Sequence, residues 1–166
     1  MPTAERLKEL LSYSPETGEF TWRFNKGRAF AGSVAGGANG LGYWLIRIDG
    51  HLCLGHRLAW LYVHGELPPG DLDHINQIKG DNRIENLRVA SRSENEQNKR
   101  RRADNTSGYR GVCWNKLKAR WMARICLHGK CRNLGYFETA ESAYAAYLDA
   151  AAQLHTHNPL TLNGGC

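Results

Sequence analysis

The feature that most constrains the fold of this chain is its polar middle, residues 71–102, which reads DLDHINQIKGDNRIENLRVASRSENEQNKRRR. The apolar residues in this stretch are too few to build a core of their own. A chain of 166 residues nevertheless has enough material for one or two domains with a real core. The core residues must therefore come mainly from the segments on either side.

Short apolar runs within the polar middle, separated by a Lys-Gly-Asp-Asn turn, predict a distorted β-hairpin followed by a helix. Ser91 with Glu94, and Ser93 with Glu96, both match the Ser-x-x-Glu capping box. We therefore expect the helix to begin between Ser91 and Ser93, which places Asn95 in its first turn.

The residues before this stretch predict a small β-rich segment that also contains helices. The dipeptide Asp49-Gly50 between two apolar runs signals a hairpin turn. Pro68 and Pro69 should stop the last helix of this segment. The expected elements are a helix at Glu5–Ser12, strands at Glu19–Phe24 and Tyr43–Ile48, and a helix at His56–His64.

The residues after the polar middle predict a three-stranded antiparallel sheet packed on one helix, so the fold class is α+β. Alternation in the central strand puts Arg120 and Arg124 on one face and Trp121 on the other. One face of the sheet is therefore available to a partner. Thr139 is suited to cap the helix. The expected strands are Tyr109–Trp114, Arg120–Leu127 and Cys131–Phe137, with a turn at His128-Gly129.

Positive charge is concentrated between Lys99 and Arg132. This stretch holds 11 Lys and Arg residues and one acidic residue, Asp104, in a chain whose net charge is +6. Such a block favours a polyanionic partner, because each neutralised phosphate releases condensed counterions. A solvated, solubilising surface is the alternative interpretation, and the aromatic residues between the cations favour nucleic acid.

Composition argues against several other classes. Apolar residues make up 42% of the chain and charged residues 23%, as in ordinary globular proteins. The chain has no apolar run of about eighteen residues and no signal-peptide pattern, so we expect neither membrane spanning nor secretion. The five cysteines lack a C-x-x-C pair, so we expect reduced thiols in a cytosol. A metal or bridging pair at Cys126 and Cys131 is the alternative.

Four polar residues, Asp73, His74, Asn86 and Asn95, match the demands of phosphodiester hydrolysis. The reaction requires an activated water, stabilisation of charge on the phosphate and neutralisation of the departing oxygen. A neutral imidazole can take a proton from water near pH 7, which suits His74 as general base. The oxygens of Asp73 and Asn95 are hard donors suited to Mg²⁺.

Residues 41–98 closely resemble the HNH homing-endonuclease family of phage genomes. The matching motifs are G-x-W-L-I-R-I-D-G, G-H-R-L-A-W, D-H-I-N, D-N-R-I-E-N-L-R and S-E-N-E-Q-N. That family has a ββα-metal core, so the resemblance implies His74 as base, Asn86 as the middle Asn, and Asp73 with Asn95 as metal ligands. Because Asn95 replaces the final His of the family name, the oxygen-only pair implies Mg²⁺ or Mn²⁺ rather than tightly bound zinc.

Several neighbouring polar residues have open roles. Asn86 also has a structural interpretation, because a loop Asn often hydrogen-bonds nearby backbone, and we expect this role to hold His74 in place. Asn82 and Asn98 are interpreted as structural. His56 is interpreted as support for the site, as a phosphate contact together with Arg57, or as a packed histidine. The other histidines, expected at the surface, are His51, His64, His128, His155 and His157.

Residues 105–163 resemble the Apetala-type ethylene-response-factor DNA-binding domain of plants, through YRGVCW, KARWMARI, LGYFETAESAYAAY and LTLN. In that family a three-stranded sheet backed by one helix enters the major groove. The family commonly has a basic residue at position 113 and an acidic one at position 124, so its base preference is not transferred. For Trp121, core packing is an equal alternative. The DNA contacts implied by position are Arg110, Trp114, Lys116, Lys118, Arg120, Trp121 and Arg124.

These patterns together predict a metal-dependent endonuclease that nicks double-stranded DNA. Residues 1–102 are the predicted HNH nuclease domain, with the ββα-metal core at about 68–102, and residues 103–166 are the predicted DNA-binding domain. The family resemblance implies 5′-phosphate and 3′-hydroxyl products, and the cytoplasm of a phage-infected bacterium as the location. We expect no membrane association and no obligate protein partner. The alternatives are a non-catalytic transcription or architectural factor and an RNA-binding or RNA-cleaving protein.

Overall fold

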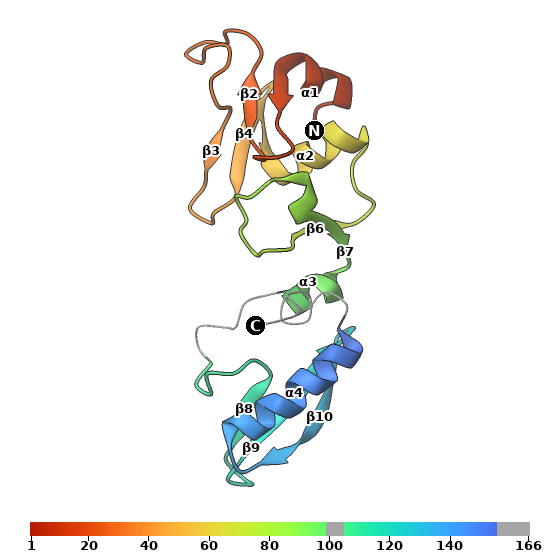
Figure 1. Cartoon of the computed structure of the whole chain (residues 1–166). Helices are drawn as coiled ribbons and strands as arrows, with labels where there is room; N and C mark the ends of the chain where they lie inside the picture. Colours follow the sequence, from red (N-terminus) through yellow and green to blue (C-terminus); the bar gives the residue numbers. More distant parts are fainter. Residues whose placement is uncertain (99–104, 156–166) are drawn as a thin grey trace. The chain divides into compact units, whose positions relative to one another are not determined.

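The computed structural model describes residues 1–98 and 105–155 (Figure 1). They divide into two compact units, one of residues 1–90 and one of the described residues from Ser91 onward. The fold is α+β, with small antiparallel sheets and helices. The helix that follows the predicted hairpin belongs to the second unit, and the domain boundary at 102/103 stays a prediction. The basic segment Lys99–Arg102, His157 and the closing Leu160–Asn163 lie outside the described residues.

The first unit contains three antiparallel sheets, ordered β1-β2, β3-β4-β5 and β6-β7. Its core gathers buried side chains from both helices and the first two sheets, including Leu7, Phe20, Ile46 and Leu58. The elements are α1 (Ala4–Leu10), β1 (Leu11–Tyr13), β2 (Phe20–Trp22), β3 (Gly37–Ala38), β4 (Trp44–Ile48), β5 (His51–Leu54), α2 (Gly55–His64), β6 (Asp71–His74), the 3₁₀ turn η1 (Ile84–Asn86) and β7 (Leu87–Ala90).

Two local predictions in this unit have different outcomes. The β4–β5 hairpin turns at Asp49-Gly50, as predicted, with φ values of 46° and 84° that fit a two-residue type I′ turn. The prediction that Pro68 and Pro69 stop α2 is wrong. The helix already ends at His64, because the following Gly65 adopts the left-handed conformation at φ 78° and its amide donates to the carbonyl of Leu61.

The second unit contains α3 (Arg92–Asn98), β8 (Val112–Asn115), β9 (Arg120–Leu127), β10 (Lys130–Phe137) and α4 (Ala140–Leu154). The sheet order is β10-β9-β8, and all its neighbours are antiparallel. The helix α4 covers one face of this sheet, where Ala143 packs with Val112 and Ala123, and Tyr147 with Ile125. The three predicted strands form, although β8 begins at Val112 and not at Tyr109. The predicted helix cap at Thr139, which accepts from the amide of Ser142 at 3.1 Å, is confirmed.

One cysteine prediction is wrong. Cys126 and Cys131 form a disulfide, whereas the sequence led us to expect reduced thiols. The two residues are direct cross-strand partners on β9 and β10, because the two-residue turn His128-Gly129 sets the register. The other described cysteines, Cys53 and Cys113, are free thiols. Among the described residues, no helix has the length and apolar character to span a membrane.

Candidate active site and DNA-binding face

The candidate catalytic base, His74, is the last residue of β6 and pairs with Leu87 of β7. Its side chain is buried, and its ring lies edge to face with that of His56 at a centroid distance of 5.0 Å. Tyr43 lies beside both rings, with centroids 5.6 Å from His56 and 6.3 Å from His74. The structure therefore brings together the predicted base and one of the histidines whose role the sequence left open.

The start of α2 brings His56 to this position. At Gly55, a Cβ atom would lie 2.7 Å from Nδ2 of Asn82 and 3.2 Å from Cβ of Trp44. A side chain at this position would require the buried Asn82 amide to shift, so glycine lets the helix begin close to the loop after β6. Asn82 is 2% exposed, and its carbonyl accepts from the hydroxyl of Tyr13 at 2.7 Å. The sequence interpreted Asn82 as structural and did not indicate that its side chain meets His74.

Burial keeps both imidazoles neutral near pH 7. Desolvation, with smaller contributions from the nearby His74 and Arg57, lowers the pKa of His56 to about 4. Burial also lowers the pKa of His74, against the opposing effects of the Asn82 amide and the Asp73 carboxylate. A neutral imidazole is the form that can accept a proton.

Asn86 holds the loop that follows β6. Its Oδ1 accepts from the amide of Asn76 at 3.0 Å, and its Nδ2 donates to the carbonyl of Asp81 at 2.9 Å. Its backbone carbonyl accepts from the amide of Ile75 at 2.9 Å. Arg83 pairs with the Asp81 carboxylate at 2.8 Å and holds its pKa down to about 2. A buried Asn thereby connects both ends of the loop beside His74.

Asp73 is engaged by an arginine that the sequence analysis missed. Nε and Nη2 of Arg88 donate to its Oδ2 at 3.0 and 2.8 Å, and the two side chains are 16% and 13% exposed. The pair follows from the hairpin register, which places Arg88 directly across from Asp73. A cation held by Asp73 would share this carboxylate with Arg88.

Asn95 lies in the first turn of α3, as predicted, and the helix begins with the predicted capping box. The amide of Glu94 donates to Oγ of Ser91 at 3.3 Å, and Oε2 of Glu94 accepts from the amide of Ser91 at 2.7 Å. The side-chain oxygen of Asn95 is buried and has no hydrogen-bond donor. Such an acceptor suits a hard cation, so the Asp73 and Asn95 oxygens fit Mg²⁺ or Mn²⁺ by chemical type.

No three His, Cys, Asp or Glu side chains gather as a metal-binding group within residues 1–98 and 105–155. The candidate ligand set therefore depends on the Asn oxygen as well as the carboxylate. Asp73 lies in the first unit and Asn95 in the second. A metal-binding role for the two remains a prediction.

The sheet of the second unit presents cations on the face away from α4. Arg120 and Arg124 are exposed there, and Nζ of Lys118 lies 3.9 Å from the ring centroid of Tyr136. Lys116 is also exposed. These are four of the seven DNA contacts predicted from the sequence, and they combine positive charge with an aromatic surface.

The remaining three predicted contacts have other neighbours. Trp114 is 46% exposed and packs edge to face with Trp121 at 5.2 Å. Trp121 packs against the core cluster of Val112 and Ala123, on the face that strand alternation assigned to it. Arg110 donates from Nη1 to the carbonyl of Gln97 at 2.7 Å. DNA contact by these residues stays a prediction.

One histidine expected at the surface is buried. His155 follows α4, packs edge to face with Tyr147 and contributes Nε2 to a 3.4 Å hydrogen bond with the carbonyl of Cys126. Its position just after an amphipathic helix gave no sign of this burial. His51, His64 and His128 are exposed, and the ring of His64 packs against that of Trp60 in a tilted arrangement, with centroids 4.1 Å apart.

Comparison with known proteins finds a family match that covers the candidate active site. Residues 53–97 match the family described as HNH endonuclease. The matched residues include His56, Asp73, His74, Asn86 and Asn95. The match ends at residue 97, so the resemblance of residues 105–163 to the plant domain stays a prediction.

A relative is found among phage proteins. Protein 3.8 of Escherichia phage T7 is 33% identical over 79 residues, which make up 47% of this chain and 65% of the phage protein. The chain thus matches a little under two thirds of that relative's length. No solved structure matches the chain.

The buried His56 should make stability depend on pH. Its folded pKa of about 4 lies below the unfolded value of about 6.5, so the unfolded state binds more protons between these values and stability falls as the pH drops. Between pH 7 and pH 4.5 this loss amounts to about 2 kcal/mol. Urea unfolding at both pH values should therefore show a smaller loss for His56→Gln than for the unchanged protein. Equal losses would contradict the assignment.

Proposed function

We propose that this chain is a metal-dependent endonuclease that hydrolyses phosphodiester bonds of duplex DNA and nicks one strand at a time. The observation that carries the proposal is the neutral, buried His74 at the end of β6, next to Asp73 and within the segment that matches HNH endonucleases. The products carry 5′-phosphate and 3′-hydroxyl ends, as the family resemblance implies.

In the proposed reaction, His74 accepts the proton of the water that attacks the scissile phosphate. The ring is oriented by its neighbours: His56 and Tyr43 pack beside it, and Asn86 fixes the loop that follows it. This packing limits rotation of the imidazole, so its reactive nitrogen keeps one direction. Arg57, which is half-buried beside His56, is proposed to contact a DNA phosphate.

Asp73 and Asn95 would hold the Mg²⁺ or Mn²⁺ ion. When bound, the ion supplies positive charge that stabilises the phosphate and the departing oxygen. Arg88 pairs with the Asp73 carboxylate across the hairpin and would orient it toward the ion. The second unit supplies DNA affinity through four exposed cations, Lys116 and Lys118 of the turn between β8 and β9, and Arg120 and Arg124 of β9.

The proposal is tested by incubating supercoiled plasmid with the protein and Mg²⁺ or Mn²⁺. We expect open circles to appear before linear DNA, because one site per chain cuts one strand in each event, and EDTA should abolish cleavage. Band shifts without nicking under either metal would instead support the non-catalytic DNA-binding factor. Preferential competition by duplex RNA over duplex DNA would favour the RNA alternative.

Substitution of Asn95 tests the oxygen ligand. Asn95→Ala removes the donor and should lower nicking at limiting Mg²⁺ by about a hundredfold, whereas Asn95→Asp retains an oxygen and should keep most of the activity. Titration of Mg²⁺ against the nicking rate measures the change in apparent metal affinity. If both variants respond to Mg²⁺ like the unchanged protein, Asn95 is not a ligand.

A further inference from the structure

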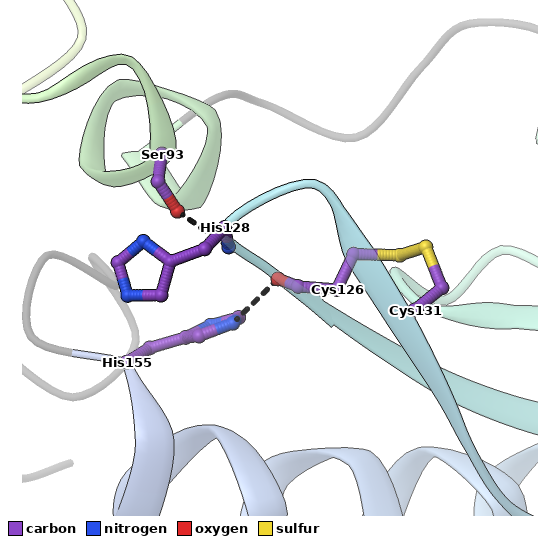
Figure 2. The surroundings of a disulfide bond; sticks show 5 residues. All are labelled: Ser93, Cys126, His128, Cys131 and His155. Carbon is purple, nitrogen blue, oxygen red and sulfur yellow. Dashed lines mark hydrogen bonds between the residues drawn. A yellow bond between two sulfur atoms is a disulfide. The ribbon is translucent and has the colours of Figure 1, made fainter.

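The helix α3, which carries Asn95, is attached near both ends to the rest of its own unit. At its first turn, Oγ of Ser93 accepts from the backbone amide of His128 at 2.9 Å (Figure 2). At its last turn, the carbonyl of Gln97 accepts from Nη1 of Arg110 at 2.7 Å. A helix of seven residues is marginal by itself, so contacts with its own unit, these two among them, contribute to holding it in place.

The contact at Ser93 comes from a hairpin that is held on both sides. His128 and Gly129 form the turn between β9 and β10, with φ values of 48° and 76°. The disulfide of Cys126 and Cys131 links the two strands just behind the turn (Figure 2). The carbonyl of Cys126 also accepts from Nε2 of His155 after α4. The backbone amide that donates to Ser93 therefore belongs to a rigid hairpin.

The contact at Gln97 involves Arg110, which the sequence predicted to contact DNA. An arginine at the C-terminal end of a helix satisfies a terminal carbonyl and complements the negative end of the helix dipole. Gln97 is 3% exposed, so water competes little for this bond. The guanidinium of Arg110 thus contributes to the internal structure of the unit.

We propose that Arg110 and the disulfide-closed hairpin 126–131 are positioning elements of the nuclease. They fix α3 and with it the Asn95 side chain, so the C-terminal unit supplies an oriented metal ligand in addition to binding DNA. This inference rests on the proposed function for its catalytic consequence. The attachment of α3 itself is independent of that function and has its own readout.

The disulfide makes this positioning sensitive to thiol reductants. A dithiol such as dithiothreitol breaks the bond between the two sulfurs; each sulfur gains one electron and one proton, and the dithiol is oxidised to its cyclic disulfide. The strands keep their backbone hydrogen bonds but lose the cross-link behind the turn. The hydrogen bond from the His128 amide to Ser93 should therefore weaken on reduction.

The test compares Arg110→Met with the matched control Arg124→Met, which removes an exposed arginine from the sheet face away from α4. Amide hydrogen exchange of peptide 91–98 in the full chain reports on α3. Arg110→Met should speed this exchange by roughly tenfold or more and lower nicking at saturating DNA, with little change in DNA affinity. Arg124→Met should weaken DNA binding and leave α3 exchange unchanged.

A second experiment measures α3 hydrogen exchange and nicking with and without dithiothreitol. Reduction should speed α3 exchange in the unchanged protein, and the double variant Cys126→Ser/Cys131→Ser should match the reduced protein and ignore the reductant. Ser93→Ala, which removes only the hydroxyl acceptor, is a second test of the hairpin contact should the cysteine variant fail to fold.

The outcomes separate this inference from the proposed function. Unchanged α3 exchange in Arg110→Met, together with weaker DNA binding, would make Arg110 a DNA contact only and overturn the inference. Unchanged exchange in Ser93→Ala and on reduction would remove the role of the hairpin. If the unchanged protein never nicks DNA, the proposed nuclease function is wrong. The exchange rates still test whether Arg110 and the hairpin hold α3.

Discussion

Replacing His74 by alanine should lower the single-turnover rate of plasmid nicking at pH 7.5 by roughly a thousandfold, within the range that a general base contributes. The expected loss is large because the imidazole is the proposed acceptor of the proton from the attacking water. DNA affinity should change little, since the proposed DNA-binding cations lie in the sheet of the second unit. Gel shifts without metal measure the affinity, and gel quantification of nicked plasmid measures the rate.

The matched control is His64→Ala. His64 is exposed at the end of α2 and packs against Trp60, outside the proposed chemistry. It should nick at nearly the unchanged rate. Because His74 is 6% exposed, His74→Gln, which keeps polar volume, accompanies the alanine variant, and circular dichroism checks that both fold. Full nicking by folded His74→Gln would place the base elsewhere.

Neutralising the sheet face should produce the second large effect. The triple variant Lys118→Ala/Arg120→Ala/Arg124→Ala removes three exposed cations from this face. If each neutralises one phosphate, the slope of log K against log salt should become shallower by about 3, and affinity near 0.15 M salt should fall roughly a hundredfold. Fluorescence anisotropy with labelled duplex DNA across a salt series measures both quantities.

A control with the same change in charge separates local contact from net charge. Lys8→Ala/Arg28→Ala/Arg47→Ala removes three exposed cations from the first unit. We expect this variant to change the salt slope by less than one. Equal losses in the two triple variants would mean that overall charge, and not the sheet face, accounts for binding.

The sequence alone predicted most of the local structure, because local structure depends on residues a few positions apart. The Asp49-Gly50 turn, the Ser91–Glu94 capping box and the Thr139 cap all form as expected. The bounds of β9, Arg120–Leu127, are also as predicted. The sequence also contained the spacing of the four candidate site residues, and the HNH family match covers all four: Asp73, His74, Asn86 and Asn95.

The disulfide was predictable from the sequence, although we did not predict it. A predicted turn at His128-Gly129 already implied that Cys126 faces Cys131, since a two-residue turn fixes the register of the strands beside it. The signal was therefore present in the sequence. It was outweighed by the absence of a C-x-x-C pattern, which concerns metal and redox motifs and says nothing about cross-strand pairs.

The environment of each site residue was decided only by the tertiary structure. The pairing of Arg88 with Asp73, the gathering of His56 and Asn82 around His74, and the bond from Arg110 to Gln97 join residues from separate elements. Periodicity tells which face of an element is apolar, but it does not tell which other element will cover that face. The sequence therefore determined which chemical groups are present, and packing determined their charge states and their partners.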